Sequence, residues 1–358
     1  MDVTLIIDND AVERVLTMGA CIDALDTAFR AYATGGAVNR PRSHTYTDRG
    51  DGHHYLFKSM DGAIAGLGVH ALRLSSDLTH EFESQGKRRR RKIPAAPGGR
   101  FVGLVLLFDI ETLVPLAIMQ DGFLQRMRVG ATSALAARHL AQPEARSVGM
   151  VGSGWQAGAQ LLGLHERGGI DEYRVYSPDP SRCRAFCDEF SERLGQEVRP
   201  VASARAAVEG VDIVALATNS HDPVIEAGWL HPGQHIGSVQ GGELDEATLE
   251  LADVIGVRSR EEATFHYVEG HAPVEAAGRK RPAASIREKM VELGDIVAGT
   301  SGRSSAHQIT LFTGGGTGAS SGLGIQFTAV AYAVLEAVRD AGGGHEVPTE
   351  WFTQTYKP

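Results

Sequence analysis

A glycine-rich turn between a strand and a helix, at residues 147–158, constrains the fold of this chain more than any other feature. The apolar run Val148–Val151 predicts a buried strand, and residues 157–167 favour a helix. The residues between them are Gly152-Ser153-Gly154-Trp155-Gln156-Ala157. This arrangement is typical of a dinucleotide-binding domain, in which the phosphates lie against the start of the helix.

The small residues of the turn have separate tasks in such a domain. Gly152 permits the tight turn, Gly154 lets a pyrophosphate approach the backbone, and Ala157 keeps the helix close to the strand. The free N–H groups and the dipole at the start of the helix then attract the phosphates. We therefore predict that residues 152–157 bind a dinucleotide.

The composition is typical of a soluble protein of about two domains. The 358 residues are 42% hydrophobic and 22% charged, and the net charge of -9 argues against nucleic-acid binding. No apolar run reaches the ~18 residues of a membrane helix, and the first residues do not resemble a signal peptide. Cys21, Cys183 and Cys187 are too few for a disulfide framework. We expect reduced thiols in a cytoplasmic protein that binds neither membrane nor nucleic acid.

Two patterns divide the chain. Between residues 43 and 119, short apolar segments separated by glycine, aspartate or charged residues predict a mostly antiparallel sheet. After residue 147 strand and helix patterns alternate, which favours a parallel, doubly wound sheet. The amphipathic closing helix, apolar at positions such as Phe327 and Val334, is expected to return to the N-terminal sheet. The predicted fold class is α/β, with a Rossmann domain over 129–317 and an α+β domain formed by 1–128 and 318–358.

Three segments with a distinctive order and spacing are Gly103-Leu104-Val105-Leu106-Leu107-Phe108-Asp109, Arg128-Val129-Gly130-Ala131-Thr132-Ser133-Ala134-Leu135-Ala136-Ala137 and the turn at 152–157. Together they resemble the ornithine cyclodeaminase/mu-crystallin family of nicotinamide-dependent proteins, and Ile309-Thr310-Leu311-Phe312 fits as well. The family includes ornithine cyclodeaminase, alanine dehydrogenase, ketimine reductases, opine-type enzymes and a thyroid-hormone-binding protein. The resemblance covers nearly the whole chain and implies that the α+β domain binds substrate and forms a dimer.

The chemistry of the family defines what the substrate site must contain. Hydride leaves a carbon next to an amine, or adds to a C=N bond, while guanidinium groups hold the substrate carboxylate. The resemblance implies that Arg128 holds this carboxylate. Arg42 is the candidate for a second arginine, with Arg40 as its competitor, because a planar guanidinium fits a carboxylate better than an ammonium does.

The sequence departs from the family at the positions that move protons. In cyclodeaminases a lysine on the third strand and an aspartate after the fifth Rossmann strand have this task. Here His70 stands at the position of the lysine, and the loop expected to carry the aspartate contains Gln240 and Glu243. Gln240 cannot replace a carboxylate, and Glu243 matches a structural glutamate of the family better than the catalytic acid. Both absences weaken a cyclodeaminase interpretation.

His70 is the candidate proton donor, because an imidazole can give a proton to an amine near neutral pH. A histidine packed between strands, with both nitrogens hydrogen-bonded, is the alternative. Arg73 lies three residues later and therefore on the opposite face of a regular strand, so only one of the two is expected to face the site. Lys58 is a third candidate if the strand alignment is shifted.

The end of the second Rossmann strand indicates the choice of cofactor. NAD-preferring sites place an acidic residue there, which binds the ribose hydroxyls. Here Ser177 has no charge that would repel a 2′-phosphate, and Arg182 could bind one, which favours NADP. Asp179 turned inward would instead favour NAD.

Later strand ends complete the expected cofactor contacts. Thr218 and Gly314 come shortly after predicted Rossmann strands, and Val239 is the last residue of one. Residues 314–318 are rich in glycine and fit either a contact with the nicotinamide or a simple linker back to the first domain.

A dense basic run, Lys87–Lys92, lies between two predicted strands. It has no interleaved aromatic residues, so a solvated loop is expected rather than a nucleic-acid site, with attraction of anionic substrates as an alternative. The histidines are scattered without the spacing of metal ligands, and no metal is expected.

The sequence thus predicts a homodimeric, NAD(P)-dependent oxidoreductase that reduces a carboxylate-bearing imine to an amine, or oxidises an amino acid. Arg128 and Arg42 would hold the carboxylate, and His70 would carry the proton. Two alternatives stay open. One is a cyclodeaminase-type lyase that releases ammonia and recycles NAD, and the other is a cofactor-dependent binding protein without catalysis.

Overall fold

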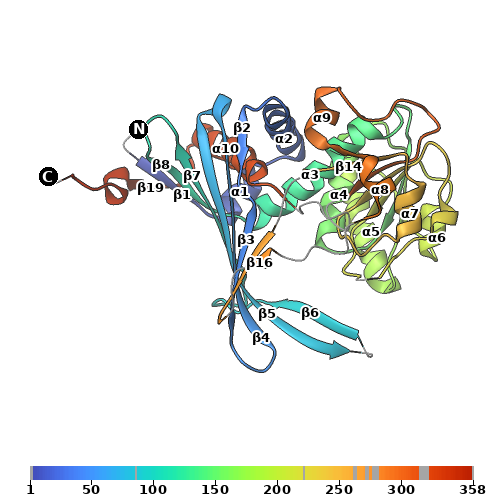
Figure 1. Ribbon diagram of the computed structural model, residues 1–358, viewed down its shortest axis with the longest axis horizontal. Coiled ribbons are helices and arrows are strands. Elements are labelled where there is room, and N and C mark those ends of the chain that lie inside the picture. The colour runs from blue at the N-terminus through green and yellow to red at the C-terminus, as the bar shows by residue number, and fades with distance from the viewer. Residues whose placement is uncertain are drawn as a thin grey trace.

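The computed structural model describes residues 3–84, 87–220, 222–260, 264–270, 274–275, 282–313 and 322–356. They form two β-sheets with their helices, which lie side by side in Figure 1. Every helix among these residues is too short or too polar to cross a membrane.

The first sheet is mostly antiparallel, as the pattern between residues 43 and 119 predicted. Its described strands are β1 (Val3–Ile7), β2 (Ala37–Asn39), β3 (Arg42–Asp48), β4 (His53–Ile64), β5 (Val69–Ser84), β6 (Lys87–Ile93), β7 (Val102–Asp109), β8 (Pro115–Gln120), β15 (Thr264–Val268), β16 (Val274–Glu275) and β19 (His345–Pro348). The order is β16-β15-β3-β4-β5-β7-β8-β1-β19, with β2 beside β4 and β6 beside β5.

Two of these strands come from a distant part of the chain. β15 lies parallel to β3, with His266 opposite His44, and β16 pairs with β15 at the edge of the sheet. The boundaries expected from the sequence put residues 264–275 in the Rossmann domain. In the structure β15 and β16, from within this range, join the other sheet.

The second sheet is entirely parallel among its described strands. They are β9 (Ser147–Val151), β10 (Glu172–Tyr176), β11 (Val198–Pro200), β12 (Ile213–Leu216), β13 (His235–Ser238), β14 (Val254–Val257), β17 (Met290–Glu292) and β18 (Thr310–Thr313). The strand order across the sheet is β11-β10-β9-β12-β13-β18-β14-β17. From β9, the chain first adds strands on one side (β10, β11) and then returns to add the others on the opposite side, starting with β12. Nucleotides bind at the carboxyl ends of the strands beside such a reversal. The doubly wound Rossmann prediction is confirmed.

The helices cover both sheets with apolar faces. They are α1 (Asn9–Val15), α2 (Met18–Ala33), α3 (Gly122–Leu140), α4 (Trp155–Glu166), α5 (Pro180–Leu194), α6 (Ala204–Val208), α7 (Glu246–Leu251), α8 (Ala284–Glu288), α9 (Leu293–Ala298) and α10 (Gly324–Asp340). Thr17 caps α2 by accepting a hydrogen bond from the backbone N–H of Ala20, and Leu25 and Phe29 of this helix are fully buried. The three cysteines are buried and form no disulfide.

The closing helix α10 packs on β4 and β5 of the first sheet, as predicted. Its start touches the β4 backbone so closely that a Cβ at Gly324 would overlap the carbonyl of Asp61. Thr328 adds a hydrogen bond from its hydroxyl to the Gly62 carbonyl, at 2.7 Å. This contact fixes the first turn of α10 above the sheet, where Gln326 and Phe327 help to build the site described below.

Helix α3 joins the two bodies. It crosses α4 so closely that a Cβ at Gly130 would overlap the carbonyl of Ala159. Leu124 and Leu135 of α3 belong to the core under the first sheet, whereas Ala137 and Ala141, at its end, belong to a core of the second. A residue on this helix is therefore held in a constant position relative to both sheets.

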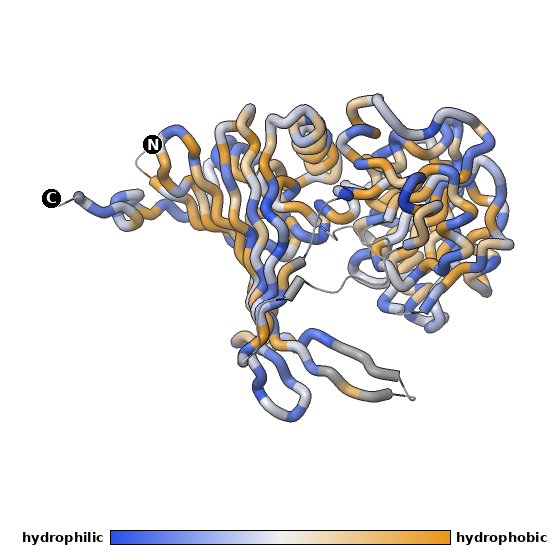
Figure 2. The backbone as a smooth tube through the Cα atoms, in the orientation of Figure 1, coloured by the Kyte–Doolittle hydropathy of each residue, from blue (hydrophilic) through white to orange (hydrophobic). Residues whose placement is uncertain are grey.

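The basic run at residues 87–92 is a strand, so the prediction of a solvated loop is wrong. It forms most of β6, which pairs with the far half of the 16-residue strand β5. The backbone register puts residue 81 opposite residue 90 and residue 83 opposite residue 88. The β5–β6 hairpin projects from the sheet in Figure 1, and its coloured part in Figure 2 is largely hydrophilic.

Candidate active site

The glycine turn has the geometry that a dinucleotide requires. Gly152 follows β9 with a φ of 120°, and a Cβ there would overlap the carbonyl oxygen of Ala217. Only glycine fits this position without strain. Gly154 is the N-cap residue of α4, and a Cβ on it would meet nothing within 4 Å, so the backbone is open to a close ligand.

The start of α4 offers hydrogen-bond donors to such a ligand. No side chain of the described residues caps the helix, and its first N–H groups have no partner within the helix. Ala157 is buried against the strand, Ser153 and Gln156 are half-buried, and Trp155 is 52% exposed. The Oε1 atom of Gln156 is buried without a hydrogen-bond partner among the described residues. These features fit the pyrophosphate of NAD or NADP.

Glu243 organises the ends of two neighbouring strands. Its buried carboxylate accepts five hydrogen bonds, from the N–H and hydroxyl of Thr218, the hydroxyl of Ser238, and the N–H groups of Val239 and Gln240. A carboxylate so fully engaged has a structural role, as the sequence suggested. It holds Thr218 and Val239 at the carboxyl edge of the sheet, where the cofactor was expected.

The residues after β10 are the ones expected to decide between NAD and NADP. One oxygen of Asp179 caps α5, accepting hydrogen bonds from the N–H groups of Ser181 and Arg182 at 3.0 and 3.1 Å. A hydrogen bond from the Ser181 hydroxyl, followed by these backbone hydrogen bonds, holds the pKa of Asp179 below its usual value. Ser177 directly follows the strand, and Arg182 lies exposed in the first turn of α5. Gly314, the last of the expected cofactor residues, lies outside the described residues.

Two arginines meet beside Gly322, which precedes α10. A Cβ on Gly322 would lie 2.9 Å from an Nη atom of Arg128 and 3.2 Å from an Nη atom of Arg42. Arg128 comes from α3 and Arg42 from the start of β3, so the structure brings together the two residues that the sequence analysis chose to hold a carboxylate.

Arg128 is held rigidly and is short of negative charge. Its side chain donates to Oε1 of Gln326 at 3.2 Å and lies over the ring of Phe327, 4.7 Å from its centroid. Only 4% of the residue is exposed. Burial lowers the pKa of Arg128 well below its usual range, and three neighbouring guanidinium groups lower it further: Arg258, Arg42 and Arg73. An anion placed here would relieve this repulsion.

Arg73, not His70, shares the inner face of the first sheet, the face that α10 covers. Its guanidinium bonds the buried carboxylate of Asp121 at 2.6 Å and lies 5.3 Å from the centroid of Phe327. Asp121 fits there because its neighbour on β7 is Gly103, where a Cβ would overlap the carboxylate. Asp121 thus forms an ion pair with Arg73, whereas the hydrogen bond that Arg128 makes within the described ranges goes to the neutral Gln326.

His70 points to the other face of the same strand. It is 41% exposed and lies 3.4 Å from Asp61, which also bonds Arg40. Arg40, the competitor of Arg42, is therefore also directed away from Arg128. The structure does not bring His70 or Arg40 to the arginine group, and the alternation of side chains along a strand is the reason.

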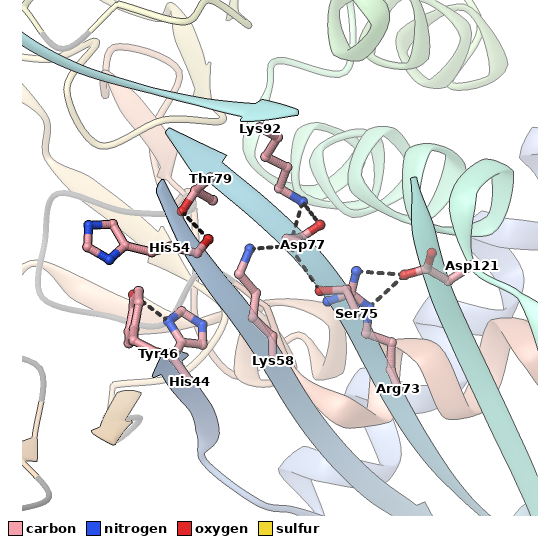
Figure 3. Close-up of polar contacts among 10 residues, drawn as sticks. All are labelled: His44, Tyr46, His54, Lys58, Arg73, Ser75, Asp77, Thr79, Lys92 and Asp121. Atoms are coloured by element: carbon pink, nitrogen blue, oxygen red, sulfur yellow. Dashed lines mark hydrogen bonds and ion pairs between the residues drawn. The ribbon is translucent and has the colours of Figure 1, made fainter. Parts of the chain in front are cut away.

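A lysine and an aspartate continue the inner face beyond the arginines (Figure 3). The ammonium of Lys58 on β4 donates to Asp77 on β5 at 2.9 Å, and the two side chains are 14% and 2% exposed. Burial lowers the pKa of Lys58 to about 8, and the charges of Lys92 and Arg42 lower it further, while Asp77 opposes them. Lys58 is paired in register with His44, which stands two residues after Arg42.

Sequence reasoning missed Asp77, Asp121 and Gln326, which position the charged groups. A signal for the first was present in β5, where Arg73, Ser75, Asp77 and Thr79 alternate with apolar or small residues and are all buried. Polar residues at every second position indicate a strand with a polar buried face, and buried polar groups gather where a ligand is bound.

Comparison with known proteins identifies the family of the chain. The sequence profile of the ornithine cyclodeaminase/mu-crystallin family matches residues 2–342. An alanine dehydrogenase of Archaeoglobus fulgidus is 27% identical over 351 residues, which are 96% of this chain and 98% of that protein.

Two solved structures share the fold over nearly their whole length. The first is the Δ1-pyrroline-2-carboxylate reductase of Thermococcus litoralis in complex with NADH and L-proline. It superposes with a TM-score of 0.75 and is 27% identical, and the match covers 96% of this chain and 100% of the reductase chain. The second is an archaeal alanine dehydrogenase dimer with bound NAD, with a TM-score of 0.75 and 26% identity, covering 96% and 99%.

Proposed function

The chain belongs to the ornithine cyclodeaminase/mu-crystallin family, and within it we propose an NAD(P)-dependent enzyme that interconverts a carboxylate-bearing imine and the corresponding amino acid. The observation that carries this proposal is the pair Arg42 and Arg128, which flank one point beside Gly322. Arg128 is buried with an excess of neighbouring positive charge, and a substrate carboxylate supplies the missing anion.

Lys58 takes the proton role in this proposal, in place of His70. It shares the inner face with Arg42, and its pKa of about 8 allows it to both give and accept a proton near neutral pH. In the reductive direction the protonated Lys58 gives its proton to the imine nitrogen of the substrate. This makes the imine carbon a better hydride acceptor. In the oxidative direction the neutral amine of Lys58 accepts the proton. Arg42 and Arg128 keep the substrate oriented in both directions.

The cofactor is NAD or NADP, and the bound nicotinamide supplies or accepts the hydride. Gly152, Gly154 and the first turn of α4 hold its pyrophosphate in this account. We propose NADP as the preferred form. The carboxylate of Asp179 is engaged in capping α5, and Arg182 is exposed next to it, where it can bind a 2′-phosphate.

The outer face of the first sheet supports a homodimer. Apolar residues of β5, β7 and β8 stand side by side there, with Leu72 opposite Leu106 and Leu106 opposite Ile118, and all three are only half-buried. A solvent-facing apolar patch of this kind marks an interface. We propose that a second copy covers it, in the cytoplasm, and light scattering should give twice the mass of one chain; a fully active monomer would contradict the dimer.

Absorbance at 340 nm tests the enzymatic proposal. Purified protein is mixed with NADPH, or separately NADH, and a panel of cyclic imino acids and of 2-oxo acids with ammonia or methylamine. Stoichiometric loss of reduced cofactor with one of these substrates, faster with NADPH, is expected. Release of ammonia from ornithine without net change in absorbance would indicate a lyase instead. Cofactor binding without turnover of any amine or imine would indicate a binding protein.

A further inference from the structure

One buried carboxylate forms ion pairs with two lysines from different strands. Lys58 of β4 and Lys92 of β6 both reach Asp77 of β5, at 2.9 and 3.0 Å, and the hydroxyl of Ser75 donates to the same carboxylate at 3.2 Å (Figure 3). Asp77 is 2% exposed. Burial alone would raise its pKa, but the two ammonium groups hold it below the usual value, so Asp77 stays ionised.

Lys92 is the last residue of the basic run, for which the proposed reaction has no task. It pairs in register with Thr79 and sends its side chain toward the inner face. The preceding residue, Arg91, pairs with His80 and lies over the ring of Phe82 on the opposite face of the hairpin, 5.3 Å from its centroid. The projecting hairpin thus delivers one ammonium group to the site from outside it.

The second ammonium changes what the carboxylate does for Lys58. A lysine with a carboxylate of its own is held in the charged form, because the pair is attractive only while the amine is protonated. When Lys92 shares the carboxylate, its charge repels the proton on Lys58 and weakens that preference. Burial is the largest cause of the lowered pKa of Lys58, and the repulsion from Lys92 lowers it further, so Lys58 changes its charge close to neutral pH, as a proton carrier must.

Several other groups face Lys58. Asp77 and Ser75 approach from β5, Lys92 from β6, and Arg42 from β3; one register pair away on β3 stands His44, whose ring stacks on that of His266 from β15 at 5.0 Å. The charge of Arg42 repels the proton on Lys58, as that of Lys92 does, but in the proposed function Arg42 binds the substrate carboxylate. The carboxylate that binds there offsets its charge, which leaves Lys92 as the cation whose effect persists during the reaction.

We propose that Lys92 is a positioning residue of the active site, which sets the protonation of Lys58 through the carboxylate of Asp77 that the two lysines share. This inference rests on the proposed function only in assigning Lys58 the proton transfer. Within the hairpin this role belongs to Lys92 alone, because its side chain reaches Asp77 whereas that of Arg91 lies on the opposite face.

The pH dependence of turnover tests the inference. In the reductive direction the rate of the natural chain should fall as the pH rises through about 8. Lys92→Met removes the repelling charge, so this descending limb should move up by about one pH unit or more. Lys92→Arg keeps the charge and should restore the natural profile, while Arg91→Met removes an equal charge from the other face and should leave the profile unchanged.

Any other outcome of these profiles overturns the inference. If Lys92→Met keeps the natural limb, Lys92 does not act on Lys58. If Arg91→Met moves the limb as much, the effect belongs to the net charge of the hairpin. If Lys92→Met raises the KM of the substrate and leaves the descending limb in place, Lys92 acts by attracting the substrate and not on Lys58.

A second measurement is independent of turnover. The rate at which an amine-acylating reagent modifies Lys58, followed by mass spectrometry of the peptide across pH, reports the pKa of this amine directly. The midpoint should lie near 8 in the natural chain and higher in Lys92→Met, with Arg91→Met as the matched control. If no substrate is ever turned over, the proposed function fails, yet this titration still decides whether Lys92 controls Lys58.

Discussion

The two faces of β3, β4 and β5 carry similar charged groups in different surroundings. On the outer face Arg40 and His70 share Asp61, and about half of the Arg40 side chain and 41% of that of His70 are exposed. On the inner face Arg42 and Arg128 approach one point beside Gly322, where Arg128 is buried and Arg42 is half-buried. The residue types alone do not distinguish the two groups.

Burial separates their roles. Water screens the exposed group, so its ion pairs contribute little, commonly under about 1 kcal/mol. On the inner face burial itself lowers the pKa of Arg128, and the weakly screened repulsion from neighbouring guanidinium groups lowers it further. Such a cluster is costly in the free protein and is relieved by an anionic ligand, which is why binding is assigned to the inner face.

The most severe loss is expected from Arg128→Met. The substrate carboxylate would lose a buried partner, and kcat/KM for imine reduction should fall by about a thousandfold or more, the equivalent of ~4 kcal/mol. The melting temperature without substrate should rise or stay unchanged, because a buried repulsive charge is removed. Unaltered cofactor affinity, measured by fluorescence titration, is the control, and normal turnover would refute the assignment.

A somewhat smaller loss is expected from Lys58→Met. Removal of a general acid typically costs about 10² to 10⁴ in rate, and it should appear in kcat with little change in KM. The limb near pH 8 should vanish from the pH–rate profile. A profile that keeps this limb would show that another group carries the proton.

An exposed charge in the second body should matter less. Arg182→Ala is expected to raise the KM for NADPH about tenfold while the KM for NADH stays the same, because only NADPH has the 2′-phosphate. Equal increases in the KM for NADPH and for NADH would mean that Arg182 does not bind the 2′-phosphate.

The smallest effect is expected on the outer face. His70→Ala should change kcat/KM by no more than about twofold, since within the described part of the chain this half-exposed side chain contacts Asp61, on the face away from Arg128. Light scattering on the variant tells an indirect effect through the dimer from a direct one. A large loss in an intact dimer would return the proton role to His70.

How much the sequence could predict differs between the two bodies. The glycine turn was found because its signal is local: a strand, Gly152, Gly154 and a helix lie within about a dozen residues of each other. Arg128 and Arg42 were named together only through the resemblance to the family, and in the structure both lie beside Gly322; that they hold a carboxylate stays a prediction.

The proton carrier could not be fixed in the same way. Successive residues of a strand face opposite sides, so an alignment displaced by an odd number of residues exchanges the two faces. That exchange separates His70 from Arg73. Lys92 reaches Asp77 only because the basic run forms a strand, and β15 joins the first sheet across more than two hundred residues of sequence; neither pairing leaves a local signal.

Two neighbouring arginines provide the most direct test of the central claim, that the inner face holds the substrate carboxylate. Arg40 and Arg42 are two residues apart, but Arg40 bonds Asp61 on the outer side, whereas Arg42 stands beside Arg128. We would measure kcat/KM for imine reduction in Arg40→Ala and Arg42→Ala under identical conditions. The account predicts a loss of about a hundredfold or more for Arg42→Ala and at most about threefold for Arg40→Ala. Equal losses, or a larger loss for Arg40→Ala, would contradict it.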